Sequence, residues 1–133
     1  MNSAIRYYSK LGHTKQIADA MAEALEIKAL SVTDEPELKE KVDVLFLGGA
    51  PYANIMSSEL KAYANNLDAE KVGCVVIFST SGWSKRTINA LRKIVEEKGI
   101  KVCEDYFYSS TGKVKDNIEA AKEFAKKIVG ADK

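Results

Sequence analysis

The sequence comprises 133 residues, of which 46% are hydrophobic, and 20 Lys and Arg residues stand against 19 Asp and Glu. The net charge of +1 offers no general attraction to nucleic acid or to an anionic membrane. The first residues lack a signal-peptide pattern, and every apolar run is far shorter than the ~20 residues of a membrane span. We therefore expect one cytoplasmic domain over residues 1–133 that binds no nucleic acid, membrane or metal.

Strand-like and helical patterns alternate along the chain, beginning with a strand over residues 4–8. Residues 14–26 carry apolar side chains at the spacing of an amphipathic helix, and residues 27–32 indicate a short, half-polar strand. A weak helix is expected over residues 35–41 (EPELKEK), because Asp34 is suited to cap it and its first turn contains a proline.

Two near-continuous apolar runs, residues 42–48 and 72–78, indicate strands buried on both faces in the middle of a parallel sheet. Residues 100–108 alternate apolar and polar side chains, which is typical of an edge strand with one wetter face. Cys74 and Cys103 fall within strand patterns, too far apart for a CxxC motif, and are expected to be free core residues. Further helices are expected over residues 57–66, 84–98 and 114–129.

Five strand–helix units of this length predict an α/β fold, a three-layer α/β/α sandwich around a five-stranded parallel sheet. The two more polar strands, the second and fifth, suit the sheet edges, which gives the strand order 2-1-3-4-5. In such sheets ligands bind beyond the carboxyl ends of the strands, where the order reverses. The site is therefore expected among the loops that follow strands one, three and four.

The first strand ends in a polar loop that leads directly into the first helix. Backbone N–H groups and the positive end of the helix dipole converge there, where a phosphate can sit. Hydroxyl side chains add donors, and a glycine lets the backbone approach a ligand closely. The alternative is an ordinary turn in which Thr14 caps the helix. The candidate phosphate-loop residues are Ser9, Lys10, Leu11, Gly12, His13 and Thr14.

The loops after the third and fourth apolar strands carry aromatic side chains. Tyr52 is suited to stack on a planar ring, and Asn54 tolerates the left-handed backbone of a turn; the alternative is a surface turn with Tyr52 on the neighbouring helix. Trp83 is the only Trp, and it sits in a small-residue loop with no core face to belong to. The candidate ligand-binding residues are Pro51, Tyr52, Ala53 and Asn54 in one loop and Ser79, Thr80, Ser81, Gly82 and Trp83 in the other.

The three loops converge on one crevice, and together they describe a ligand that is phosphorylated, flat and aromatic. Flavin mononucleotide (FMN) meets all three requirements. The chain also resembles the flavodoxin family over essentially its whole length. The resembling segments are YSKLGHTKQIA in the first loop, VDVLFLGGAPYANIMSSELKAYANNL around the second and VVIFSTSGWS around the third.

This resemblance implies a short-chain flavodoxin-like protein that binds FMN noncovalently and transfers single electrons between redox enzymes, which it contacts transiently. It implies that Ser9, Gly12 and Thr14 hold the phosphate and that Tyr52 and Trp83 flank the flavin. The alternatives are a flavodoxin-fold FMN oxidoreductase acting on a quinone or a porphyrinogen-like substrate, and a degenerate binding module without flavin. A monomer is expected.

Three features depart from the family pattern, one of which is the absence of a glycine often found in the loop that contains Asn54. Leu11 replaces a usual Thr or Ser and so removes one hydroxyl from the phosphate loop. Carriers of the family are usually strongly acidic, whereas this chain has basic residues near the predicted ligand face. These residues are Lys10, His13, Lys15, Lys85 and Arg86.

Overall fold

A parallel sheet forms the middle layer of the computed structural model, which describes residues 2–52, 55–82 and 85–130. Its neighbouring strands are ordered β2-β1-β3-β6-β7, and β8 also pairs with β6. This arrangement confirms the predicted α/β fold and the order 2-1-3-4-5, with β7 and β8 sharing the fifth position. The strands are β1 (Ser3–Tyr7), β2 (Ala29–Ser31), β3 (Val42–Gly49), β6 (Val72–Ser81), β7 (Lys101–Val102) and β8 (Phe107–Ser110).

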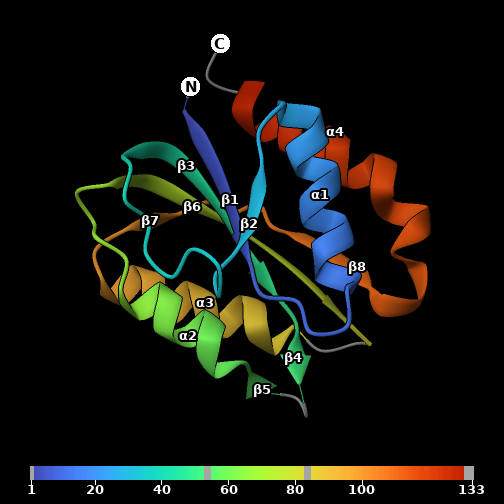
Figure 1. The fold of residues 1–133 in the computed structure, drawn as a ribbon, viewed down its shortest axis with the longest axis horizontal. Coiled ribbons are helices and arrows are strands. Elements are labelled where there is room, and N and C mark those ends of the chain that lie inside the picture. The colour runs from blue at the N-terminus through green and yellow to red at the C-terminus, as the bar shows by residue number, and fades with distance from the viewer. Residues whose placement is uncertain (1, 53–54, 83–84, 131–133) are drawn as a thin grey trace.

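The α-helices of the described residues cover both faces of the sheet (Figure 1). On one face α1 (His13–Leu25) packs against α4 (Ile118–Gly130), and on the other α2 (Ser58–Asn65) packs against α3 (Arg86–Glu97). Each helix turns its apolar stripe toward the sheet, so the sheet separates two hydrophobic cores. The three-layer sandwich follows directly from this division.

The central strands β3 and β6 are buried along most of their length, as their apolar runs predict. Gly48 pairs with Phe78 across these two strands. A Cβ atom at Gly48 would collide with the Phe78 ring, so the ring packs directly against backbone at the carboxyl end of β3. The close approach of β3 to β6 at the site edge therefore depends on this glycine.

The helix expected over residues 35–41 is wrong, because no helix forms there. The backbone N–H groups of Asp34 and Glu35 donate to the Ser31 carbonyl, which makes a turn in place of a cap. In this segment only Leu38 is buried. One inward side chain gives too little apolar burial to stabilise so short a helix.

The strand expected over residues 100–108 is interrupted. Val75 of β6 pairs with Val102, and Phe78 pairs with Phe107. Between these pairs β6 advances three residues and the opposing chain advances five, so two extra residues interrupt the ladder. The chain then makes two 3-10 turns (Thr111–Lys113 and Lys115–Asn117), so the last helix begins at Ile118, later than expected.

The loop after β3 contains additional regular structure. An antiparallel hairpin of β4 (Pro51–Tyr52) and β5 (Ile55–Met56), which the sequence did not predict, follows β3. Cys74 and Cys103 are half-buried and pack against the α1–α4 core. Over the described ranges no helix is long and apolar enough to cross a membrane, and no group of three or more His, Cys, Asp or Glu is placed to hold a metal ion.

Candidate functional site

The loops after β1, β3 and β6 enclose a cavity of about 100 Å³ at the carboxyl edge of the sheet. This is the position that the reversal of strand order between β1 and β3 predicts. The described lining includes five hydroxyl side chains, one imidazole and no carboxylate. Its residues are Ser9, Leu11, His13, Thr14, Ala50, Pro51, Thr80, Ser81, Gly82 and Thr111.

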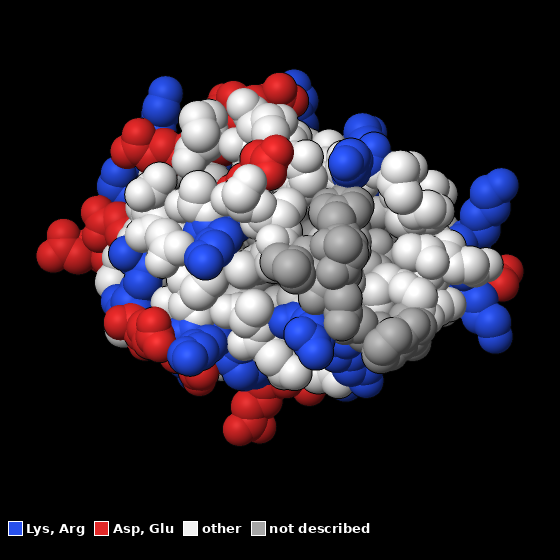
Figure 2. Space-filling view, turned by 90° about the horizontal axis from the view of Figure 1, so that it is seen from below, with Lys and Arg blue, Asp and Glu red and all other residues white. Residues whose placement is uncertain are grey.

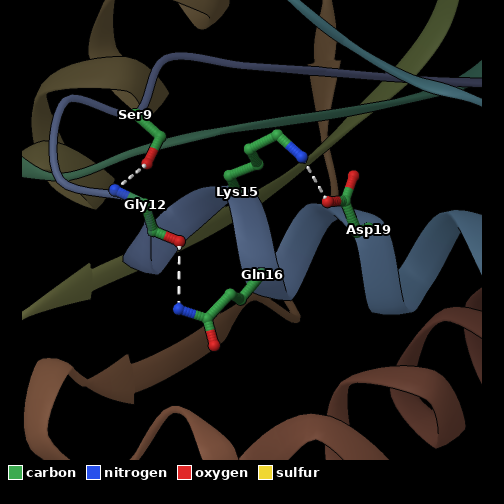
Figure 3. Close-up of polar contacts among 5 residues, drawn as sticks. All are labelled: Ser9, Gly12, Lys15, Gln16 and Asp19. Carbon is green, nitrogen blue, oxygen red and sulfur yellow. Dashed lines mark hydrogen bonds and ion pairs between the residues drawn. The ribbon is translucent and has the colours of Figure 1, made fainter.

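The first loop folds back on itself before the helix starts (Figure 3). Gly12 is the N-cap of α1 and adopts a left-handed backbone with a φ of 94°, which glycine takes without strain. Its N–H donates to Ser9 Oγ over 3.0 Å, and its carbonyl accepts from the backbone and side-chain N–H groups of Gln16. These bonds bring the first turn of α1 to the cavity wall.

Lys15 extends from the exposed side of this first turn (Figure 3). Its Nζ lies 2.7 Å from Asp19 Oδ2, one helical turn further on. The hydrogen bond to Asp19 and the negative charge of that carboxylate raise the pKa of Lys15. The predicted basic character of this turn is therefore partly neutralised by Asp19.

Thr14 links the first loop to the third. Its hydroxyl oxygen lies 2.8 Å from that of Thr80, and both side chains are buried. Because Gly12 is the N-cap, Thr14 lies inside the helix and the alternative of a Thr14 cap is wrong. The link fixes the start of α1 against the end of β6.

The third loop is anchored by the segment around β8. The Tyr108 hydroxyl lies 2.8 Å from Ser81 Oγ and 3.3 Å from the Ser81 carbonyl oxygen. Lys85 donates to the Tyr106 hydroxyl at 3.2 Å, and its Nζ lies about 5.5 Å from the centroids of both tyrosine rings, within the range of a cation–π contact. Both sides of the third loop are thus tied to one pair of tyrosines.

Sequence reasoning missed Thr111, Tyr106 and Tyr108. The two tyrosines follow the alternation of the fifth strand near its carboxyl end, and this pattern was the available signal. Thr111, the first residue of a 3-10 turn, reaches the cavity because β8 continues parallel to β6 as far as Ser110. No local pattern in the sequence marks that extension.

The remaining predicted residues are placed as follows. Lys10 is exposed and Ser79 is fully buried, and neither lines the cavity. Leu11 lines the cavity although 73% of its surface is exposed. The Tyr52 backbone lies in β4 and forms part of the hairpin. Ala53, Asn54 and Trp83 lie outside the described residues.

The size and lining of the cavity indicate which chemical group it suits. A volume of about 100 Å³ is well below the roughly 300–1,000 Å³ of pockets that take a whole drug-sized ligand. Hydroxyl groups and the positive end of a helix dipole favour an anion. The described cavity therefore fits a phosphate-sized anionic group.

No protein-family model and no curated protein matches the sequence, but solved structures match the fold closely. Oxidised flavodoxin 1 from Bacillus cereus is 16% identical over 96% of this chain and 97% of its own, with a TM-score of 0.78. A short-chain flavodoxin associated with a non-canonical PDU bacterial microcompartment is 16% identical over all of both chains, with a TM-score of 0.74.

A mutant flavodoxin from Fusobacterium nucleatum, bound to flavin mononucleotide, is 18% identical over 94% of this chain and 93% of its own, with a TM-score of 0.68. These three structures share the length as well as the topology of the chain. Together with the sheet order and the position of the cavity, they show that the chain adopts the flavodoxin-like fold.

Proposed function

We propose that the protein binds FMN and acts as a small one-electron carrier between redox proteins. The observation that carries this proposal is the convergence of three loops on a hydroxyl-lined cavity at the N-terminus of α1. The cavity suits the phosphate of FMN, and the FMN bound to the Fusobacterium flavodoxin supports the choice of ligand.

In this proposal the first loop and Thr80 hold the phosphate. Ser9 already orders the loop by accepting from the Gly12 N–H. The N–H groups of the first turn of α1 have no acceptor within the helix, so they are suited to donate to phosphate oxygens. His13 lines the same cavity, where its imidazole N–H is suited to add a further donor.

The second and third loops hold the flavin ring. Pro51, at the start of the β4–β5 hairpin, lines the cavity together with Thr80, Ser81 and Gly82 at the end of β6. Tyr52 and Trp83 are the proposed ring contacts. FMN supplies the redox chemistry when it is bound, and the protein positions it and excludes water from part of its surface.

Parallel titrations of the purified protein with FMN and with riboflavin test the proposal. We expect flavin absorbance near ~370 and ~450 nm, quenched flavin fluorescence and much tighter binding of FMN than of riboflavin, because only FMN carries the phosphate. If riboflavin binds as tightly as FMN, the cavity does not bind the phosphate. Failure to bind either flavin at micromolar concentration would leave a flavin-free binding module.

A further inference from the structure

A second hollow lies between α2 and α3, outside the cavity described above. It has a volume of about 560 Å³ and an apolar floor formed by Met56, Ala90 and Ile94. At its far end the Lys98 Nζ donates to the Asn65 carbonyl over 2.7 Å and joins the two helices. We call this hollow the α2–α3 groove.

Basic side chains dominate the rim of the α2–α3 groove. Lys61 of α2 and Arg86 and Lys93 of α3 line it, all exposed, against the single carboxylate of Glu97. Among the described residues Lys61 and Lys93 form no ion pair. Since the whole chain carries a net charge of only +1, this is a local excess of positive charge.

The groove continues from the edge of the proposed flavin site. Met56 ends the hairpin of the second loop, and Arg86 begins the helix after the third loop. On the face seen from below, most acidic side chains lie toward the margins, while several basic ones lie nearer the middle (Figure 2). A protein seated in the groove would therefore approach the loops that hold the ring.

We infer that the α2–α3 groove is the docking surface for an acidic redox partner, which places carboxylates on Lys61, Arg86 and Lys93 around an apolar side chain on the floor. The inference rests on the proposed carrier function, because it names the class of partner. Charge complementarity at a rim raises the association rate by roughly 10- to 1,000-fold and is screened by salt. A small anion suits the groove less well, because the floor is apolar and the groove volume of about 560 Å³ is far larger than one phosphate.

Zero-length carbodiimide cross-linking tests the inference, because it couples carboxylates to lysines that already touch them. The probe is succinylated horse cytochrome c, an acidic redox protein, and native cytochrome c, which is basic, is the comparison. At low ionic strength we expect cross-links from the succinylated form to Lys61 and Lys93, lost at about 0.5 M salt, where the screening length is only a few ångströms. Cross-links spread evenly over the surface lysines would overturn the inference.

Matched charge reversals sharpen the test. We expect Lys61→Glu/Lys93→Glu to lower the affinity for succinylated cytochrome c at least ~10-fold at low salt. The control, Lys41→Glu/Lys101→Glu, makes the same change of net charge at exposed residues on the opposite edge of the sheet, where β3 and β7 begin. Equal losses in both variants would show a general charge effect and reject the groove.

Two further results separate the inference from its alternatives. The first compares how well millimolar inorganic phosphate and succinylated cytochrome c protect Lys61 and Lys93 from acetylation. Equal protection by phosphate would assign the groove to a small anion and overturn the inference. Cross-linking needs no flavin, whereas the FMN titration reads only the proposed function. Lost FMN binding with retained cross-links would therefore reject the carrier function and keep the groove as a docking surface for an acidic protein.

Discussion

The hydroxyl oxygens of Thr14 and Thr80 lie 2.8 Å apart, although the two residues are 66 positions apart along the chain. Thr14 is 1% exposed and Thr80 is fully buried. The bond joins the first turn of α1 to the end of β6, at the wall of the cavity. Because neither hydroxyl is open to water, each satisfies the other, and removing one leaves its partner buried without that bond.

A double-mutant cycle with valine, which keeps the shape of threonine, measures this link. We expect Thr80→Val alone to lower the free energy of unfolding by about 1–3 kcal/mol, the cost of one buried polar group left without a partner. Thr14→Val/Thr80→Val should cost less than the sum of the single changes, with a coupling of about 0.5–3 kcal/mol. Urea unfolding without flavin provides the measurement, and strict additivity would contradict the pairing.

Leu11 offers a direct test of the proposed phosphate site, since it lines the cavity with 73% of its surface exposed. Leu11→Thr supplies a hydroxyl donor, and one additional hydrogen bond of about 1 kcal/mol tightens FMN binding roughly fivefold. Riboflavin, which lacks the phosphate, should bind the variant and the original protein equally. Leu11→Ala is the control, because it removes the apolar side chain without adding a donor. An equal gain with Leu11→Ala would assign the effect to lost bulk.

The contact between Gly48 and Phe78 predicts a steric effect on stability. In Gly48→Ala the new methyl group meets the Phe78 ring, and overpacking of this kind costs about 1–3 kcal/mol of unfolding free energy. In Gly112→Ala the methyl group meets nothing within 4 Å, so the change should stay within about 0.5 kcal/mol. Chemical denaturation of both variants supplies the comparison, and similar losses would remove the special role of Gly48.

The buried hydroxyl of Tyr63 predicts a loss of stability at high pH. Burial raises the pKa of Tyr63 to about 12 from an ordinary value of 10.0, although the charge of Arg6 opposes the shift. The unfolded chain therefore loses this proton first, so the stabilisation is complete below pH 10 and disappears as the pH rises toward 12.

Unfolding free energies measured from pH 9 to 12 check this effect. Tyr63→Phe should reduce the decline in this interval, while the raised pKa of Tyr7, which is also due to burial, leaves a smaller decline in place. Absorbance at about 295 nm should show one tyrosine fewer titrating late in the variant. A decline identical to that of the original protein would place the alkaline sensitivity elsewhere.

The layers and the sheet order were predictable because local patterns report burial directly. The apolar runs of β3 and β6 allow only central strands, and the stripes of the four helices show which side faces the sheet. The position of the cavity follows from the reversal of strand order, so Ser9, Thr14 and Thr80 could be placed at one site before any contact was known.

Features that depend on contacts between segments far apart in the sequence were not predictable. Capping signals favoured a helix over residues 35–41, but burial of Leu38 alone did not stabilise one, and Glu40 instead lies 3.8 Å from the buried Arg6. The interruption of the fifth strand depends on a two-residue difference in length against β6. The periodicity of one strand does not indicate the length of the strand that pairs with it. The interruption was therefore not predicted, and neither were the positions of Tyr108 and Thr111 at the site.

The interrupted fifth strand also affects whether copies of the chain can pair through the edges of their sheets. An exposed sheet edge aggregates when it offers a long, continuous row of unpaired backbone groups to another strand. Here one edge is β2, of three residues, and the other is divided between β7, of two, and β8, of four. A net charge of +1 provides little mutual repulsion. We therefore expect the shortness of both edges, more than electrostatic repulsion, to keep concentrated protein from joining strand to strand.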